Sequence, residues 1–315
     1  MRSQRGVALI TGLLIVSLAT VAAVSFATQQ QLDIRRTGNL IDGDEAWTYA
    51  TAGEAWAKLI LRKDFENSPE TDNLNEAWAQ PLPSIHLPGG YMVGRISDAQ
   101  ALFNLNNLVV QNRQNLAAVN QMQRLLILLK LDPNLVYPII DWIDPDINAT
   151  PPAGAEDDYY TGLAHPYRTT NRYMGSASEL RLVKGFNEKV YQRIAPYVTA
   201  LPTTTPTLIN VNTAPAVILA VVANIDPKDA VALVQLRQDN PFKMTDEFQR
   251  ALSDVAKVTP AQESAESQPV FGVKTNYFNL TIETRIGYGR AALPSLIARA
   301  GAANIQVLQR TQGLS

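Results

Sequence analysis

The sequence predicts an α+β protein, in which a long N-terminal helix packs on a small antiparallel sheet and a large all-α segment is inserted between the strands. Three observations support this prediction. No proline interrupts residues 7–68. Apolar and polar residues alternate near 91–108 and again at 276–289 and 302–310, as in strands. The long stretch between these strands contains apolar segments that begin with helix-start signals.

The N-terminus begins with a short basic leader, MRSQRG, followed by an apolar run. Residues 7–27 are 21 consecutive residues without a charge, and about 20 helical residues cross the hydrocarbon core of a bilayer. Arg2 and Arg5 precede the run and mixed charges follow it, so the positive-inside rule keeps the N-terminus in the cytoplasm and exports the rest. A conventional signal peptide is the alternative, because Ser25-Phe26-Ala27 fits the small-x-small cleavage pattern.

The absence of proline lets one helix continue from the apolar run into an amphipathic half. At about 1.5 Å per residue, the segment 7–64 would form a rod on the order of 85 Å long. The amphipathic half is expected to pack on the globular body through a stripe at helical spacing, formed by Tyr49, Gly53, Trp56 and Ile60 with Ala46 and Ala57 beside them.

The predicted strands come from both sides of the insertion. YMVGRISDAQALFNLNNL predicts two short strands about a turn at Ser97-Asp98. Near the C-terminus, one strand alternates again at Ile305 and Val307, and a longer one places five residues on one face: Phe278, Leu280, Ile282, Thr284 and Ile286. The predicted body therefore comprises residues 67–105 and 270–315, with 106–269 as the inserted all-α part.

An internal echo divides the insertion. FNLNN at 103–107 is followed by LLKLDPNLVYPIIDWID, and INVNT at 209–213 by VVANIDPKDAVALVQLR. In both, Asp before Pro predicts a helix start, with Asp132 and Asp226 as N-caps and Pro133 and Pro227 at the first helical position. The Thr/Pro linker 201–207 separates two units, about 106–200 and 205–269, which resemble SAM-like or helix-hairpin-helix bundles.

The composition excludes several kinds of site. The chain has no cysteine, which removes thiol catalysis, thiolate metal sites and disulfides. Its two histidines, His86 and His165, lie beside prolines in loop-like sequence and are expected at the surface. The net charge is −2, and the hairpin turns LKLDP and ANIDP lack the glycines that approach a phosphate, so no nucleic-acid partner is expected. GxSxG and HExxH motifs are absent, and no enzyme activity is predicted.

The segment IIDWIDPDINATPPAGAEDDYYTG concentrates carboxylates. Asp144, Asp146 and Asn148 stand at positions 1, 3 and 5 of a calcium-loop pattern, which then fails at Ala149, where an EF-hand needs glycine. The six acids within 18 residues would repel one another unless they are solvated or bridged by a cation such as Ca²⁺; they are Asp141, Asp144, Asp146, Glu156, Asp157 and Asp158. The alternative is a solvated acidic helix end whose carboxylates cap helices or pair with Arg168, Arg172 and Arg181.

The leader ending in Gly6, the apolar helix that continues into an amphipathic one, and the domain that follows resemble the type IV pilins and the type II secretion pseudopilins. The segments DWIDPD, AEDDYY, SASELRLVKG and INVNTAP extend the resemblance to the K-type minor pseudopilins of type II secretion, over essentially the whole chain. The resemblance implies a pilin-like fold and a structural role without enzyme activity. It also implies that calcium can be bound, at the acidic positions above.

The resemblance further implies processing, location and partners. A prepilin peptidase would cut between Gly6 and Val7, and the new N-terminus at Val7 would be methylated. Helix 7–66 would hold the chain in the inner membrane as a single span, with the C-terminal domain in the periplasm. The subunit would assemble at the tip of the pseudopilus with the I- and J-type minor pseudopilins, and with the H type, on the inner-membrane assembly platform.

Thr11 departs from the family pattern, which usually has Glu at the fifth mature position. In a pilin-like fibre this buried carboxylate is thought to neutralise the N-terminal ammonium of a neighbour. A topmost subunit has no neighbour above it to neutralise, and a threonine hydroxyl can bond back to a helix carbonyl. Together with the role that the resemblance implies, the predicted function is to nucleate or cap the pseudopilus for export of folded proteins across the outer membrane. The rival is a secreted calcium-dependent binding protein or hydrolase with a conventional signal peptide.

Overall fold

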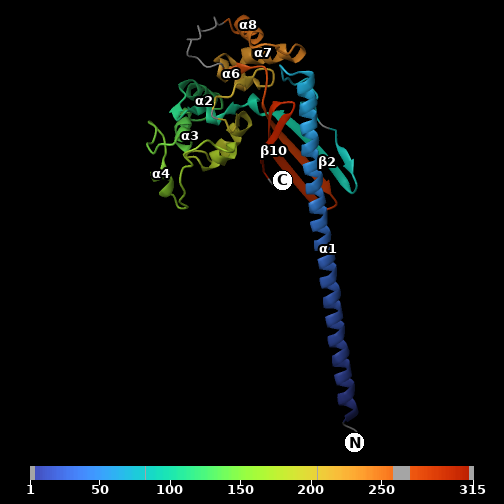
Figure 1. Ribbon diagram of the computed structural model, residues 1–315. Coiled ribbons are helices and arrows are strands. Elements are labelled where there is room, and N and C mark those ends of the chain that lie inside the picture. The colour runs from blue at the N-terminus through green and yellow to red at the C-terminus, as the bar shows by residue number, and fades with distance from the viewer. Residues whose placement is uncertain (1–3, 82, 204, 258–269, 312–315) are drawn as a thin grey trace.

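The computed structural model describes residues 4–81, 83–203, 205–257 and 270–311. Helix α1 (Gln4–Asn67) runs unbroken for 64 residues, about 96 Å at the standard rise, which confirms one continuous helix. Its N-terminal half stands clear of the rest of the chain, and its C-terminal half packs on the body (Figure 1). Among the described helices, α1 alone is long and apolar enough to span a membrane, with a mean hydropathy of 2.5 in its most apolar window.

A five-stranded antiparallel sheet packs against the C-terminal half of α1 (Figure 1). The strand order is β1-β2-β9-β10-β11, with β1 (Ile85–Leu87), β2 (Gly90–Asp98), β9 (Tyr277–Ile286), β10 (Gly289–Gly301) and β11 (Asn304–Arg310). All five residues predicted to share a face of β9 are buried, which confirms that strand. Sequence alternation does not reveal β10, because Pro294 interrupts a pattern that otherwise fits a strand.

The predicted turn at Ser97-Asp98 is wrong. Strand β2 continues to Asp98, whose side chain accepts a hydrogen bond from Gln100 N at 2.7 Å and caps a 3-10 turn at 99–101. An aspartate suits a cap as well as a hairpin turn, because in both its carboxylate accepts from a nearby backbone N–H. After this turn the chain leaves the sheet and enters the inserted part.

The contact between α1 and the sheet combines small residues with a few larger apolar ones, among them the fully buried Leu61. Ala46, Ala50, Gly53 and Ala57 are buried, whereas Trp56 is 36% exposed. A Cβ at Gly53 would lie 2.8 Å from Met92 Sδ, so the helix approaches the strands too closely for a larger side chain. The predicted stripe is therefore correct for the small residues and for Tyr49 and Ile60, which are half-buried against the same core, and wrong for Trp56.

The inserted α-domain lies between β2 and β9 and has two units that share one hydrophobic core. The first contains α2 (Leu116–Leu128), α3 (Val136–Ile143), α4 (Asp157–Thr161) and α5 (Glu188–Ile194), and the second contains α6 (Ala216–Ala223), α7 (Pro227–Asp239) and α8 (Thr245–Ala256). A two-residue parallel ladder closes each unit. These ladders are β3 (Phe103–Asn104) with β6 (Val198–Thr199), and β7 (Ile209–Asn210) with β8 (Phe271–Gly272). A short hairpin of β4 (Val109–Val110) and β5 (Arg113–Gln114) precedes α2.

The repeated asparagine motif has the same role in both units. Asn106 donates to Met174 O at 3.0 Å and accepts from Met174 N at 2.8 Å. Asn212 makes the equivalent pair with Phe242, at 2.8 and 2.9 Å. Each side-chain amide therefore takes the place of a backbone partner deep in the core, which explains why the echo in the sequence preserves asparagine.

The two predicted helix starts are confirmed. Asp132 and Asp226 each accept a hydrogen bond from the backbone N–H two residues on, at 2.9 and 3.0 Å. Pro133 opens a 3-10 turn that leads into α3, and Pro227 is the first residue of α7. The Asp-Pro pairs thus fix where both helical segments begin.

A buried arginine joins α1, the sheet and the segment between them. The guanidinium of Arg299 in β10 donates to Asp64 Oδ2 at 2.8 Å and to Asp72 Oδ1, and all three side chains are at least 90% buried. Asp72 Oδ2 also accepts from Thr275 N at 2.8 Å. Burial raises the pKa of Asp64 to about 6, although its bond to Arg299 opposes that rise.

Hydrogen bonds extend this group into the α-domain. Asp98 Oδ2 accepts from Asn210 Nδ2 at 2.9 Å and from Thr213 Oγ1 at 2.6 Å, and Asn210 Nδ2 also donates to Asp72 O at 3.1 Å. Burial raises the pKa of Asp98 to about 6. We call Asp64, Asp72, Asp98, Asn210 and Arg299 the buried junction.

Replacing Arg299 with leucine tests this junction. The substitution leaves two carboxylates buried without their cation, so the free energy of unfolding should fall by about 3–5 kcal/mol. Urea unfolding of the full-length chain in detergent measures it. Arg290→Leu is the matched control, since Arg290 lies on the same strand but is exposed, and it should change stability by less than about 0.5 kcal/mol. Equal losses in both variants would contradict the role of the junction.

Candidate functional site

The acidic segment forms a loop between two short helices. Helix α3 ends at Ile143, Asp144 is its C-cap, and Glu156 precedes α4. The two helix ends are brought together, so that Asp141, Asp144 and Glu156 each place a carboxylate oxygen within 4.8 Å of the other two. All three are buried, at 0%, 6% and 6% exposure. We call these three residues the acidic cluster.

Backbone amides fix the loop around Asp141. Its carboxylate accepts from Thr150 N at 3.0 and 3.1 Å and from Ala155 N at 2.6 Å. The loop closes tightly enough that a Cβ on Gly154 would lie 2.1 Å from Asp141 Oδ2. The position of Asp141 is therefore set by the fold of the chain itself.

The other two carboxylates lack such partners. Asp144 Oδ1 and Glu156 Oε1 are buried without a hydrogen bond, and no ion pair between described residues includes any member of the acidic cluster. Burial, followed by repulsion from neighbouring carboxylates, raises the pKa of Asp144 and of Glu156 to about 7 in each case. Burial also raises the pKa of Asp141. Buried unpaired carboxylate oxygens are costly unless a proton or a cation neutralises them.

The remaining predicted acids lie at the edge of this group. Asp146 is exposed and accepts from Asn148 N at 2.8 Å. Asp157 pairs with Arg168 at 3.2 Å, as the alternative of capping and pairing predicts for that residue, and Asp158 is exposed on α4. The structure thus gathers three of the six predicted acids and leaves three outside.

Sequence reasoning missed Asn171. Its side-chain Oδ1 is buried without a partner, while its Nδ2 donates to Asp146 O at 3.2 Å, which places it against the same loop. Its φ of +46° is unusual for a residue other than glycine. No spacing pattern links Asn171 to the acids, because it comes from a separate loop 15 residues beyond Glu156.

A second acidic group, formed by Asp64, Asp72 and Glu76, has the same oxygen spacing but different surroundings. Arg299 neutralises the two aspartates. Glu76 accepts from the indole N–H of Trp78 at 2.7 Å. This group therefore has its own donors and needs no added cation.

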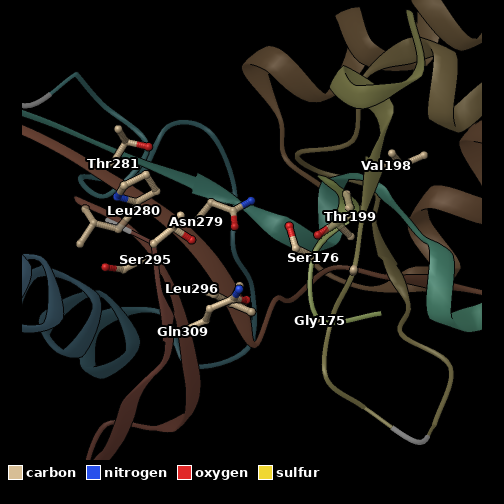
Figure 2. Close-up of a pocket in the computed structure, with 14 residues that line it drawn as sticks. Gly175, Ser176, Val198, Thr199, Asn279, Leu280, Thr281, Ser295, Leu296 and Gln309 are labelled. Atoms are coloured by element: carbon tan, nitrogen blue, oxygen red, sulfur yellow. The ribbon is translucent and has the colours of Figure 1, made fainter. Parts of the chain in front are cut away.

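A cleft of about 280 Å³ lies between the α-domain and the sheet (Figure 2). Ser176 and Thr199 line it from the α-domain, and Asn279, Ser295 and Gln309 line it from the sheet. Its lining contains no titratable side chain and none of the predicted site residues.

At the other end of the molecule, Thr11 lies in the exposed apolar part of α1. Its Oγ1 donates to Val7 O and to Ala8 O, both at 3.0 Å. The hydroxyl is therefore satisfied within its own helix, as the sequence predicts. Gly6 and Val7 both lie inside α1.

Comparison with known proteins decides the family. Two family models described as type II secretion system (T2SS), protein K, match residues 101–203 and 209–267. A protein K from Pseudomonas aeruginosa is 37% identical over 99% of this chain and 94% of the relative, and one from Aeromonas hydrophila is 33% identical over 99% and 98%. The chain belongs to the type II secretion system protein K family. It is a minor pseudopilin of that system.

A solved structure supports the same assignment. The chain resembles a chain of the GspK-GspI-GspJ complex from the enterotoxigenic Escherichia coli type 2 secretion system, with a TM-score of 0.75 and 26% identity. The match covers 89% of this chain and 100% of that one. The predicted pilin-like fold with a large helical insertion is thereby confirmed, and the apolar half of α1 fits a single-pass membrane anchor by length and composition.

Proposed function

We propose that this minor pseudopilin ends the pseudopilus at its tip, where it assembles with the I- and J-type subunits, and with the H type, on the inner-membrane assembly platform. The observation that carries the proposal is the position of the α-domain. Its α6–α8 unit lies at the end of the body remote from the apolar half of α1, and its α2–α5 unit lies beside the sheet (Figure 1), so the α-domain occupies the side on which a further subunit above this one would have to sit. The related structure contains GspK together with GspI and GspJ, which supports the choice of partners.

Thr11 supports a terminal position. A glutamate buried in a fibre needs a cation from a neighbour, because an unpaired charge in an apolar environment is costly. Thr11 has no charge and bonds to its own helix. A subunit with no neighbour above it loses nothing by this replacement.

The processing proposal is cleavage between Gly6 and Val7 by a prepilin peptidase, followed by methylation of Val7. Before assembly, α1 would hold the chain in the inner membrane with the body and α-domain in the periplasm. The rival signal peptide would be cut after Ala27. Helix α1 runs through that position without interruption. Family membership gives the rival no support.

The proposal includes a structural Ca²⁺ at the acidic cluster. Asp141, Asp144 and Glu156 offer only oxygen ligands, which suit a hard cation. Two of them hold buried oxygens without partners, and Asn171 offers a neutral oxygen beside the same loop. Bound calcium would neutralise the carboxylates and tie the end of α3 to the start of α4. The role is structural, and no enzyme activity is proposed.

Mass spectrometry of the mature N-terminus tests the processing step. The chain purified from cells that express the secretion system should begin at N-methylated Val7. The Gly6→Leu variant should retain its leader and begin at Met1, because it lacks the glycine after which the peptidase would cut. A mature chain beginning at Thr28 would contradict the pseudopilin function and support the signal peptide.

Thr11→Glu tests the terminal position. Since a tip subunit has no ammonium above it to neutralise, restoring glutamate should lower exoprotein secretion by less than about threefold. Co-purification with the I- and J-type subunits should persist. Thr11→Val, which keeps the shape and removes the hydroxyl, is the control and should secrete normally. Complete loss of the complex with I and J in Thr11→Glu would count against this account of Thr11.

Chelation tests the calcium proposal. For the full-length chain in detergent, removing Ca²⁺ with EGTA should lower Tm by about 5–10 °C, the range expected for loss of a ligand present at about 100 times its Kd. Asp144→Asn should abolish most of this calcium dependence, whereas Asp158→Asn, the matched control in the same segment, should retain it. A transition that EGTA leaves unchanged would remove the calcium proposal.

A further inference from the structure

Five exposed side chains, four on strands and one in a turn, form a row across the outer face of the sheet. The strand register pairs His86 with Tyr91, Tyr91 with Arg285, and Arg285 with Arg290. Tyr288 lies in the adjoining β9–β10 turn and is 86% exposed, while Tyr91 is 43% exposed. We call these five residues the arginine–tyrosine row. Adjacent strands lie about 4.8 Å apart, so the row is about 14 Å long across four strands.

The two arginines of the row face each other across neighbouring strands. Arg285 and Arg290 stand directly opposite each other on β9 and β10, and like charges in that position destabilise a sheet. No ion pair between the residues that the structure describes includes either one. Glu283 lies two residues before Arg285 on the same face of β9 and is likewise in none of these ion pairs. Asp42 of α1, the other nearby acid, accepts a hydrogen bond from Tyr288 N at 3.0 Å. The fold alone gives no reason for this charge arrangement.

The row lies at the end of the body where α1 emerges. Strand β10 and helix α1 run in the same direction. Tyr288 N, just before β10, contacts Asp42, then Ser295 Oγ contacts Glu54, and Arg299 contacts Asp64. The row is therefore level with residue 42 of α1. Below it, the part of α1 that carries the apolar run is exposed. Another subunit of the same architecture, with its own helix packed along that exposed half, would bring its globular body against this end.

We propose that the arginine–tyrosine row binds an acidic surface on the body of the adjacent pseudopilin subunit, on the membrane side of this chain. The inference rests on the proposed function, because it requires assembly into the pseudopilus. Arginine and tyrosine are among the residues that contribute most to protein interfaces. A partner carboxylate between Arg285 and Arg290 would remove their repulsion and would set the register of the contact.

Site-specific photocrosslinking tests this contact. A benzophenone amino acid replaces Tyr288 in the full-length chain, which is expressed with the other pseudopilins of its system. Irradiation should yield an adduct with another pseudopilin. Adducts with lipid alone would overturn the inference in favour of the membrane surface. Absence of any adduct, in cells where the chain still co-purifies with the I- and J-type subunits, would overturn it and leave the proposed function standing. Loss of both the adduct and the co-purification would overturn this inference and the proposed function together.

Charge reversal tests the arginines. Arg285→Glu/Arg290→Glu should reduce the adduct at least about tenfold, because like charges then face each other across the interface. Arg285→Lys/Arg290→Lys should retain most of it. Lys189→Glu/Arg193→Glu makes the same change in charge at exposed positions of α5 and should leave the adduct unchanged. Thermal unfolding should be the same for all of these variants. An undiminished adduct in the folded Arg285→Glu/Arg290→Glu chain would overturn the inference.

Discussion

A single buried cation fixes how the parts of this molecule meet. Arg299 is 1% exposed and lies between Asp64, near the end of α1, and Asp72, in the segment that follows it. A buried guanidinium is tolerable only when carboxylates and further acceptors surround it, so the helix end, the following segment and β10 can adopt only one arrangement. Through Asn210, the same network reaches Asp98 at the point where the chain leaves the sheet for the α-domain.

This constraint explains how a large insertion can act as a fixed part of a fibre subunit. The α-domain leaves the body after β2 and returns at β9, and Asp98 and Thr275 stand close to these two crossings. Within the domain, Asn106 and Asn212 bind distant backbone groups through both side-chain atoms. The chain has no cysteine, so buried hydrogen bonds supply the connections that disulfides provide in many exported proteins.

Local patterns could be predicted and distant pairings could not. The continuous α1, the buried face of β9 and the Asp-Pro helix starts depend on neighbouring residues, and each is confirmed. Strand β10 was missed because Pro294 breaks its pattern. The partners of Arg299 lie more than 220 residues away in the sequence, and nothing in their surroundings indicates the pairing. At the candidate metal site, spacing identified the acidic segment, but only the folded loop distinguishes Asp141, Asp144 and Glu156 from the acids that stay exposed.

The two acidic groups show why composition alone does not define a metal site. In both, three carboxylates place oxygens within 4.8 Å of one another. In the group of Asp64, Asp72 and Glu76, Arg299 supplies positive charge and the Trp78 indole supplies a donor, so the chain itself satisfies these carboxylates. At the acidic cluster, only Asp141 is fully served by backbone amides, and buried oxygens of Asp144 and Glu156 face no donor. Each group consists of two aspartates and a glutamate, but only the first is supplied with donors by described residues, whereas the second keeps two buried oxygens without one, which is the physical basis for proposing calcium there.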